Sequence, residues 1–553
     1  MPDSTPNNPS SVQSKKIHER RLFKKKNDES EEMLLDFLLR FYPDDSHKTE
    51  FLSPLRRADN RYVTSEKTLN NWIDLRIFSE TQLKSVLRWL TTSPPVLRVL
   101  FSWLLVKKMG MKLAYFDQNE DKNPDKFYAK NAITEAQGDN VSIHNLGHAT
   151  QLIQVPRSDA PGMNVLIDPV FGDLAPLIYP SMTKRFGDGY DIKANELPTI
   201  DVILISHNHR DHVDEASLKE IIKKAAIENR EQPEMLVPNG DKIFFESLGF
   251  TKVREFEWHE QITLNNVTFC SAPADHRSGR TATDKHKSLV MGWTISPKDK
   301  KEILYFAGDT AKISKVRMTS LALDVYQLFQ HKQNGIIKPD ELPKIINLEP
   351  GGPNYTRKDM KPTHQSAVDS ITSAFRLAVE LEKVSEKYHH DDKKIDAQKW
   401  LDATATIFMH HNKFELGPDR FNENIFIFNR LLSYLRMDKA TLALNKDKQQ
   451  SKSKIWSLFH RRKDFIIEGV EDLQLLAATI WPECTEHEQK IKLIEFIEAR
   501  THFPLIRQKI TSEEVYTFDY GTRSSIMPDT LRDESGRLKG EKEDYEHGVA
   551  PKM

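Results

Sequence analysis

Histidine and aspartate are concentrated in one short segment of the chain, which reads Ser206-His207-Asn208-His209-Arg210-Asp211-His212. Four of these seven side chains can bind a divalent metal through imidazole nitrogen or carboxylate oxygen. The whole chain has 20 histidines among 553 residues, so a chance His-x-His-x-Asp-His is expected about once in a thousand such sequences. The segment therefore predicts a metal site in preference to a solvated His-rich loop.

The spacing of these residues predicts two cations. An apolar run at residues 202–205 precedes the motif and is a predicted strand. Side chains two apart in an extended segment point the same way, so His207 and His209 can bind one cation together. Asp211 and His212 are expected on the turn into a helix over 215–229, where they can reach a second cation. Two cations about 3.5 to 4 Å apart generate hydroxide near neutral pH, which predicts hydrolysis, with Asp211 orienting that hydroxide.

Further candidate ligands follow later apolar runs that are also predicted strands. Open α/β sheets place their sites at strand ends. Each histidine or aspartate alone is weak evidence, because an isolated His at a strand end is more often structural. In this order after the first motif they predict one cluster. The candidates are His276 after residues 267–269, Asp309 after 303–306, and His410 or its neighbour His411 after 406–409, the expected last core strand.

The pattern between about residues 140 and 310 must position these groups. Short β-branched runs alternate there with turn residues and some helical patterns, which predicts a mixed α/β core with strands buried on both faces. Four regions are expected along the chain. They are a disordered basic tail at 1–32, a helical region at 33–135, a catalytic domain at 136–430 with helical insertions near 311–345 and 376–400, and a basic linker with a helical region at 431–553.

The motif order resembles that of the metallo-β-lactamase-fold hydrolases. Three further segments make it similar to the branch of N-acylphosphatidylethanolamine-hydrolysing phospholipases D: Leu-Gly-His-Ala-Thr at 146–150, Leu-Ile-Asp-Pro-Val-Phe at 166–171, and residues 197–209. The similarity covers about residues 140 to 420. It implies a four-layer αβ/βα sandwich, here with helical N- and C-terminal extensions, and two metals, usually zinc. The extensions, the insertion near 311–345 and the loop at 349–352 depart from the family pattern.

The resemblance also assigns the ligands. It implies one metal on His207, His209 and His276, a second on Asp211, His212 and His410, and Asp309 as the bridge between them. His410 is preferred over His411 because of the His-x-x-x-Phe pattern at 410–414. No expected ligand is replaced, which favours two metals over one. Zinc suits these donors best, but iron and manganese are also permitted.

Three more residues are candidates for supporting roles. His148 and Asp168 lie at predicted turns before the motif, where groups that fix imidazole tautomers are needed; ordinary turn chemistry is an equal alternative, above all for Asp168 before a proline. His364 precedes a predicted helix from Ser366. In the resembling branch a His in this region contacts the substrate phosphate, and a helix N-terminus favours an anion. His364 is therefore interpreted as a phosphate binder or leaving-group acid, with a surface residue as the alternative.

The function implied by the resemblance is a phosphodiesterase of phospholipase D type acting on N-acylphosphatidylethanolamine-like phospholipids. A lactone or other ester hydrolase is the second hypothesis, since the pocket and not the ligands selects the substrate. A metal-dependent ribonuclease is the third. Nucleic acid is disfavoured because 80 Lys and Arg are balanced by 81 Asp and Glu and the basic runs contain few aromatics. An inactive scaffold is disfavoured by the intact ligand set.

Two segments could bring the chain to a lipid surface. Residues 95–106 form an apolar stretch that ends in two lysines, and residues 446–463 place Trp456 and Phe459 among basic side chains. Core helices and a solvated linker are the alternatives. Neither segment approaches the ~20 apolar residues of a membrane span. With two cysteines, Cys270 and Cys484, and no secretory signal pattern, the expected location is cytoplasmic, with peripheral membrane contact.

Overall fold

Twelve stretches of the chain are described by the computed structural model, residues 55–56, 62–63, 133–157, 161–172, 192–281, 284–332, 341–351, 363–388, 395–410, 423–437, 465–504 and 508–517. The predicted basic tail, the apolar stretch 95–106 and the basic segment 446–463 lie outside these residues. Four residues of the predicted helical region 33–135 form strands instead, β1 (Leu55–Arg56) and β2 (Tyr62–Val63), which pair antiparallel.

The first sheet has seven strands in the order β16-β3-β4-β5-β6-β7-β8. Neighbours from β16 to β5 are antiparallel, and neighbours from β5 to β8 are parallel. The strands are β3 (Ser142–Asn145), β4 (Gln151–Val155), β5 (Met163–Ile167), β6 (Val202–Leu204), β7 (Glu234–Pro238), β8 (Val253–Phe256) and β16 (Lys509–Thr511). Strands β4, β5 and β6 are buried at every residue, as expected for strands covered on both faces.

The second sheet has the order β15-β14-β13-β12-β11-β10-β9. It is antiparallel from β9 to β12 and parallel from β12 to β15. Its strands are β9 (Gln261–Leu264), β10 (Val267–Pro273), β11 (Met291–Pro297), β12 (Glu302–Phe306), β13 (Lys344–Pro350), β14 (Thr404–Met409) and β15 (Thr501–His502).

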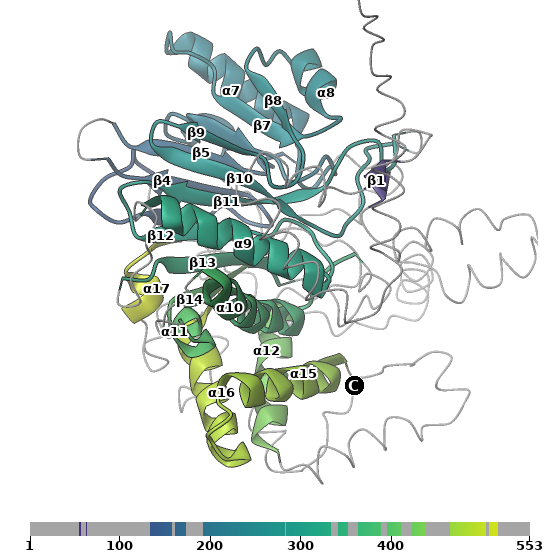
Figure 1. Ribbon diagram of the computed structural model, residues 1–553. Coiled ribbons are helices and arrows are strands. Elements are labelled where there is room, and N and C mark those ends of the chain that lie inside the picture. Colours follow the sequence, from purple (N-terminus) through teal and green to yellow (C-terminus); the bar gives the residue numbers. More distant parts are fainter. Residues whose placement is uncertain are drawn as a thin grey trace, which may run out of the picture.

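The two sheets pack face to face and are covered by helices on their outer faces (Figure 1). One apolar cluster joins both inner faces, for example Ile153 and Leu204 with Phe269 and Trp293. Helices α7 (Glu215–Ile227) and α8 (Lys242–Ser247) and the short η3 (Ala194–Glu196) lie on the first sheet. Helices α9 (Lys315–Lys332), α10 (Ala367–Tyr388) and α11 (Ala397–Asp402) cover the second. The predicted four-layer αβ/βα sandwich is confirmed.

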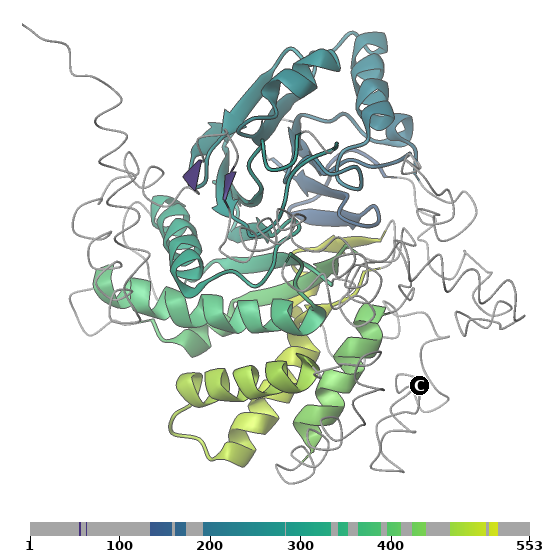
Figure 2. The same ribbon diagram turned by 90° about the vertical axis from the view of Figure 1, so that its right-hand side faces the viewer.

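The chain after residue 430 is built into this sandwich. Helices α12 (Glu423–Arg436), α15 (Phe465–Ile480) and α16 (Glu486–Arg500) share the apolar cluster of α10 and lie beyond it from the sheets (Figure 2). Strand β15 then pairs with β14, and β16, followed by α17 (Glu514–Thr517), pairs with β3. The expectation that residues 406–409 form the last core strand is therefore wrong. Strands of two and three residues are too short to show a periodic pattern.

The described helices include none that is both long and apolar enough to cross a membrane. The predicted domain boundaries at residues 136 and 430 stay predictions.

Candidate metal centre

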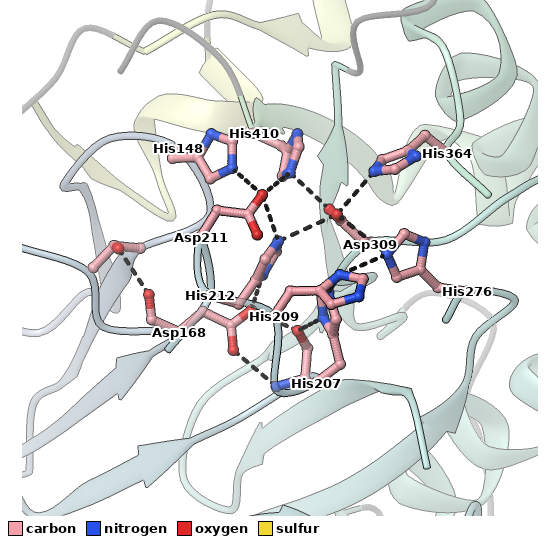
Figure 3. Close-up of polar contacts among 12 residues, drawn as sticks. His148, Asp168, His207, His209, Asp211, His212, His276, Asp309, His364 and His410 are labelled. Atoms are coloured by element: carbon pink, nitrogen blue, oxygen red, sulfur yellow. Dashed lines mark hydrogen bonds and ion pairs between the residues drawn. The ribbon is translucent and has the colours of Figure 1, made fainter. Parts of the chain in front are cut away.

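Ten polar side chains meet at one edge of the sandwich, where strand ends of both sheets come together (Figure 3). They come from the loops after β3, β5 and β6 of the first sheet, from the loops after β10, β12 and β14 of the second, and from the segment before α10. All ten are residues that the sequence singles out: His148, Asp168, His207, His209, Asp211, His212, His276, Asp309, His364 and His410.

Three histidines form the first group of this cluster. The Nδ1 atom of His209 lies 2.9 Å from Nε2 of His207 and 3.2 Å from Nε2 of His276. The outer nitrogen of His276, Nδ1, donates to the carbonyl oxygen of Thr363 at 2.6 Å, so the neutral ring turns the lone pair of Nε2 toward His209. Three ring nitrogens that approach this closely are well placed to share one cation.

A second group lies beside the first. Ligand atoms of His148, Asp211, His212 and His410 lie within 4.8 Å of one another. Oδ2 of Asp211 is 3.8 Å from Nε2 of His410 and 4.0 Å from Nε2 of His212. Both of these histidine nitrogens are buried and make no hydrogen bond of regular geometry, although each lies beside a carboxylate oxygen of Asp309. A buried polar atom of this kind is costly unless something binds it.

The carboxylate of Asp309 reaches both groups. Its Oδ2 lies 3.2 Å from Nε2 of His212 and 3.7 Å from Nε2 of His276, and its Oδ1 lies 3.0 Å from Nε2 of His410. The buried Oδ1 atom makes no hydrogen bond. These orphaned atoms and the mixed imidazole and carboxylate donors fit a binuclear metal site, while the donor types alone do not select the metal.

The electrostatics favour the metal-binding form at five of the seven proposed ligands. Burial, reinforced by neighbouring imidazoles, lowers the pKa of His207 and His276 well below the usual value, and burial lowers that of His209 to about 4. Burial alone would raise the pKa values of Asp211 and Asp309, but surrounding histidines hold both well below the usual range. Neutral imidazole and ionised carboxylate are the forms that bind metals. At the other two ligands, burial alone would lower the pKa, but Asp309 and neighbouring carboxylates raise the pKa of His212 well above the usual value and that of His410 to about 8, so metal binding at these rings would release a proton.

Asp168 orients one member of the second group, His212, through a hydrogen bond. Its Oδ2 accepts hydrogen bonds from Nδ1 of His212 at 2.7 Å and from the Ser206 hydroxyl at 2.6 Å, and its Oδ1 accepts from the Ser206 N–H at 2.8 Å. The acceptor fixes the His212 tautomer that presents Nε2 to the cluster. Asp168 has a backbone φ of +45°, in the left-handed region that Asp tolerates better than most residues.

His148 holds two members of the second group. Its Nε2 lies 3.2 Å from Oδ2 of Asp211, and its carbonyl oxygen accepts the His410 N–H at 2.7 Å. The rings of His148 and His410 have centroids 3.8 Å apart. His148 has a φ of +53°, so this position is a strained turn. His148 thus contacts the predicted ligands directly. It is also close enough to Asp211, His212 and His410 to bind the same cation, since the ligand atoms of all four lie within 4.8 Å of one another.

His364 lies inside the cluster and is 5% exposed, so the alternative of a surface residue is wrong. Its Nε2 is 3.0 Å from Oδ2 of Asp309, and its Nδ1 is 3.0 Å from the Thr363 hydroxyl oxygen. It precedes α10 by three residues, close to the predicted helix start. His410 belongs to the cluster as preferred, and His411 lies outside the described residues.

Two supporting contacts are not among those expected from the sequence. The Ser206 hydroxyl bridges Asp168 and Nδ1 of His207, at 2.6 and 3.0 Å, and the Thr363 carbonyl orients His276. Ser206 stands at the start of the metal motif, so its position was a usable signal. The carbonyl of Thr363 carries no side-chain signal, because its role depends on a contact 87 residues away in sequence.

Comparison with known families agrees with this geometry. Residues 163–331 match the family model described as beta-lactamase superfamily domain. The matched span contains the metal motif, His276 and Asp309, whereas His148, His364 and His410 lie outside it.

Curated relatives extend the resemblance. The chain is 28% identical over 245 residues to the mitochondrial N-acyl-phosphatidylethanolamine-hydrolyzing phospholipase D of Saccharomyces cerevisiae, covering 41% of this chain and 49% of that protein. It is 26% identical over 223 residues to N-acyl-phosphatidylethanolamine-hydrolyzing phospholipase D 1 of Caenorhabditis elegans, covering 37% and 59%. The chain thus spans about half the length of the curated relatives it matches. The resemblance to this branch is confirmed.

Solved structures are more distant. An isothiocyanate hydrolase from Delia radicum gut bacteria is 15% identical, with a TM-score of 0.34 over 67% of this chain and 98% of that chain. The diiron β-hydroxylase CmlA of Streptomyces venezuelae is 16% identical, with a TM-score of 0.30 over 68% and 55%.

Proposed function

We propose that the chain is a binuclear metal-dependent hydrolase. The observation that carries the proposal is the Asp309 carboxylate, which lies within 3.7 Å of ring nitrogens from both histidine groups. His207, His209 and His276 would hold one cation, and Asp211, His212 and His410 the other, with Asp309 shared. Zinc is the proposed metal. Two divalent cations would supply an activated water at neutral pH and positive charge for the oxygens of the group under attack.

The side chains divide the remaining work. Asp168, Ser206 and the Thr363 carbonyl hold three ring tautomers, so the inward nitrogens need no rearrangement when a ligand binds. The Asp211 side chain is 21% exposed, whereas those of His212 and Asp309 are buried. We infer that substrate enters on the Asp211 side. There the carboxylate can orient a water, since His148 already fixes its position at 3.2 Å.

The proposed substrate is a phosphodiester of the N-acylphosphatidylethanolamine type, cleaved as by a phospholipase D. Support comes from the two named relatives, which act on this lipid by their descriptions, and from the segments at 146–150, 166–171 and 197–209, which resemble that branch. A phospholipid substrate requires peripheral contact with a membrane. The two segments expected to make that contact lie outside the described residues, so the proposal rests on the site.

The assay that tests this function is release of phosphatidic acid from N-acylphosphatidylethanolamine in mixed micelles by the zinc-loaded protein. Asp211→Ala is expected to lower the rate by at least about 10²-fold, since a proposed metal ligand and the group that orients the water are lost together. The exposed Asp402 on α11 provides a matched control, and Asp402→Ala should retain the wild-type rate. A wild-type protein that binds two metals but releases no phosphatidic acid would overturn the lipid assignment. A wild type that binds no metal would overturn the hydrolase proposal.

His364 is proposed to act on the substrate phosphate or its leaving group. We expect His364→Ala to keep both metals and to lower kcat by about 10²- to 10⁴-fold, the range for a general acid. Metal content by elemental analysis and turnover on the same sample measure the two effects separately. His331→Ala, at the exposed end of α9, is the control. Loss of one metal would instead make His364 a ligand, consistent with its 3.0 Å approach to Asp309.

A further inference from the structure

Arg280 lies behind the metal motif and contacts its backbone at two points. One terminal nitrogen, Nη1, donates to the carbonyl oxygen of Asn208 at 3.1 Å and to that of Val213 at 3.0 Å. These two carbonyls bracket the stretch that contains Asp211 and His212. The side chain of Arg280 is only 7% exposed, so both hydrogen bonds are largely shielded from water.

The bracketed stretch is a turn, not a regular element. Its own backbone bonds converge on the carbonyl of His209, which accepts the N–H groups of His212 and Val213 at 3.1 and 2.9 Å. The carbonyls of Asn208 and Val213 therefore face outward, away from this turn. Buried carbonyls need donors, and Arg280 supplies one to each. Because both bonds come from the single nitrogen Nη1, they hold the two ends of the turn at a fixed separation.

Arg280 is itself held in place by three independent contacts. Its Nη2 pairs with Oε1 of Glu215 at 2.9 Å, in the first turn of α7. Its guanidinium lies 4.9 Å from the centre of the Phe244 ring. Its backbone N–H donates to Oδ2 of Asp284 at 3.0 Å. An arginine fixed at its backbone N–H and at two points of its guanidinium can impose a geometry on the backbone that it contacts.

The side chain of Asn208 also joins the metal motif to the segment that contains Arg280. Its Oδ1 accepts the N–H of Gly279 at 2.7 Å, while its Nδ2 donates to Asp241 at 2.7 Å and to the Ser288 hydroxyl at 2.9 Å. Asn208 stands between two proposed ligands in the motif, and it is 5% exposed. The segment around Gly279 and Arg280 is thus joined to the metal motif through both side chain and backbone.

We propose that Arg280 is a positioning residue of the metal centre, which staples the turn from Asn208 to Val213 so that Asp211 and His212 face His410 and Asp309. This inference rests on the proposed binuclear site. Residues that orient metal ligands typically change metal affinity by about 10- to 100-fold when replaced. Arg280 touches none of the proposed ligand side chains in the contacts described, so its effect would pass through the backbone of the turn.

The test is metal affinity, measured by competition with a chromophoric chelator, together with the absorption spectrum of the cobalt(II) form. Relative to the wild type, Arg280→Ala is expected to bind the lower-affinity metal ion of the two about 10- to 100-fold less tightly. Its cobalt(II) form should also show an altered absorption spectrum. The affinity of Arg280→Lys should fall between those of the wild type and Arg280→Ala, because an ammonium can donate to the two carbonyls but lacks the second terminal nitrogen that pairs with Glu215. Added methylguanidinium should return the affinity of Arg280→Ala toward that of the wild type.

The matched control is Arg254→Ala. Arg254 is 52% exposed and pairs with Glu234 at 3.1 Å on the far edge of the first sheet, so two-metal affinity and spectrum should equal those of the wild type. Wild-type affinity and spectrum in folded Arg280→Ala would overturn the inference. If Arg280→Ala does not fold, Arg280→Lys is judged by the same criterion. Absence of metal from the wild type itself would instead overturn the proposed function.

Discussion

The hydrogen bonds of the outward-facing ring nitrogens determine which nitrogen of each histidine is free to bind a metal. Nδ1 of His212 meets Asp168, Nδ1 of His276 meets the Thr363 carbonyl, and Nδ1 of His207 meets the Ser206 hydroxyl, at 2.7, 2.6 and 3.0 Å. Each contact leaves Nε2 facing the cluster. A neutral imidazole has one donor and one acceptor, so a fixed outer donor means a fixed inner lone pair.

Replacing the Asp168 acceptor tests this arrangement. In Asp168→Asn the shape is kept, but an amide NH₂ placed at the Oδ2 position would face the N–H of His212. The ring should then adopt the other tautomer and lose its inward lone pair. We expect metal affinity to fall about 10- to 100-fold, measured by chelator competition. Asp201→Asn is the control, because Asp201 accepts the Asn164 N–H at 2.7 Å at the other end of β6. Equal affinities in the two variants would contradict the tautomer argument.

At the scale of elements, the packing of α15 on α10 depends on one small residue. Gly469 lies in α15 against Val368 of α10, and a Cβ at position 469 would collide with Cγ1 of Val368. Glycine inside a helix is ordinarily unfavourable by roughly 1 kcal/mol relative to alanine. Close approach of the two helices explains why it is present here.

Gly469→Ala should therefore destabilise the protein by about 1 to 3 kcal/mol, the usual cost of overpacking, despite its better helix propensity. The free energy of unfolding in urea measures the change. In a Val368→Ala background the collision with Cγ1 is removed and only a close contact with Cβ of residue 368 remains, so the same substitution should cost much less. This double-mutant cycle isolates the contact. Additive effects of the two substitutions would show that Gly469 and Val368 do not interact.

The elements also show where sequence reasoning succeeds and where it stops. Strands β5, β6, β10, β12 and β14 are apolar runs that end at turn residues, so the positions of the candidate ligands after them could be predicted. Strands β15 and β16 could not, because their two and three residues are ordered by pairing with β14 and β3. The Arg280 contact to Val213 likewise joins residues 67 apart, which no local pattern encodes. The ligand roles themselves stay predictions.

At the scale of the whole molecule, the cluster ties the two sheets together. Proposed ligands after β6 belong to the first sheet, and those after β10, β12 and β14 belong to the second. A metal ion that binds only the native state of a protein stabilises that state. Metal at this edge would therefore resist separation of the two sheets, while the apolar cluster between their inner faces holds the rest of the sandwich.

The stability of the molecule should also depend on one buried acid outside the cluster. Glu349 is the penultimate residue of β13, before Pro350, and is 1% exposed. Its Oε2 accepts the Gln365 amide at 3.1 Å, and Gln365 accepts the Ser373 hydroxyl at 2.7 Å. Burial raises the pKa of Glu349 to about 8, against a partial opposing effect of the Gln365 hydrogen bond. The native protein therefore holds this carboxyl neutral at pH 7.

Between the ordinary Glu pKa of 4.5 and about 8, the native state keeps a proton that the unfolded chain has released. Stability must then fall as pH rises through this window, by at most about 1.4 kcal/mol per pH unit. Glu349→Gln removes this titration, so its stability relative to wild type should grow from pH 6 to pH 8 in urea unfolding of the chelator-treated proteins. Glu488→Gln is the control: its pKa is lowered by Thr485 hydrogen bonds, so its difference from wild type should be constant there. A constant difference for Glu349→Gln would mean that native Glu349 is ionised.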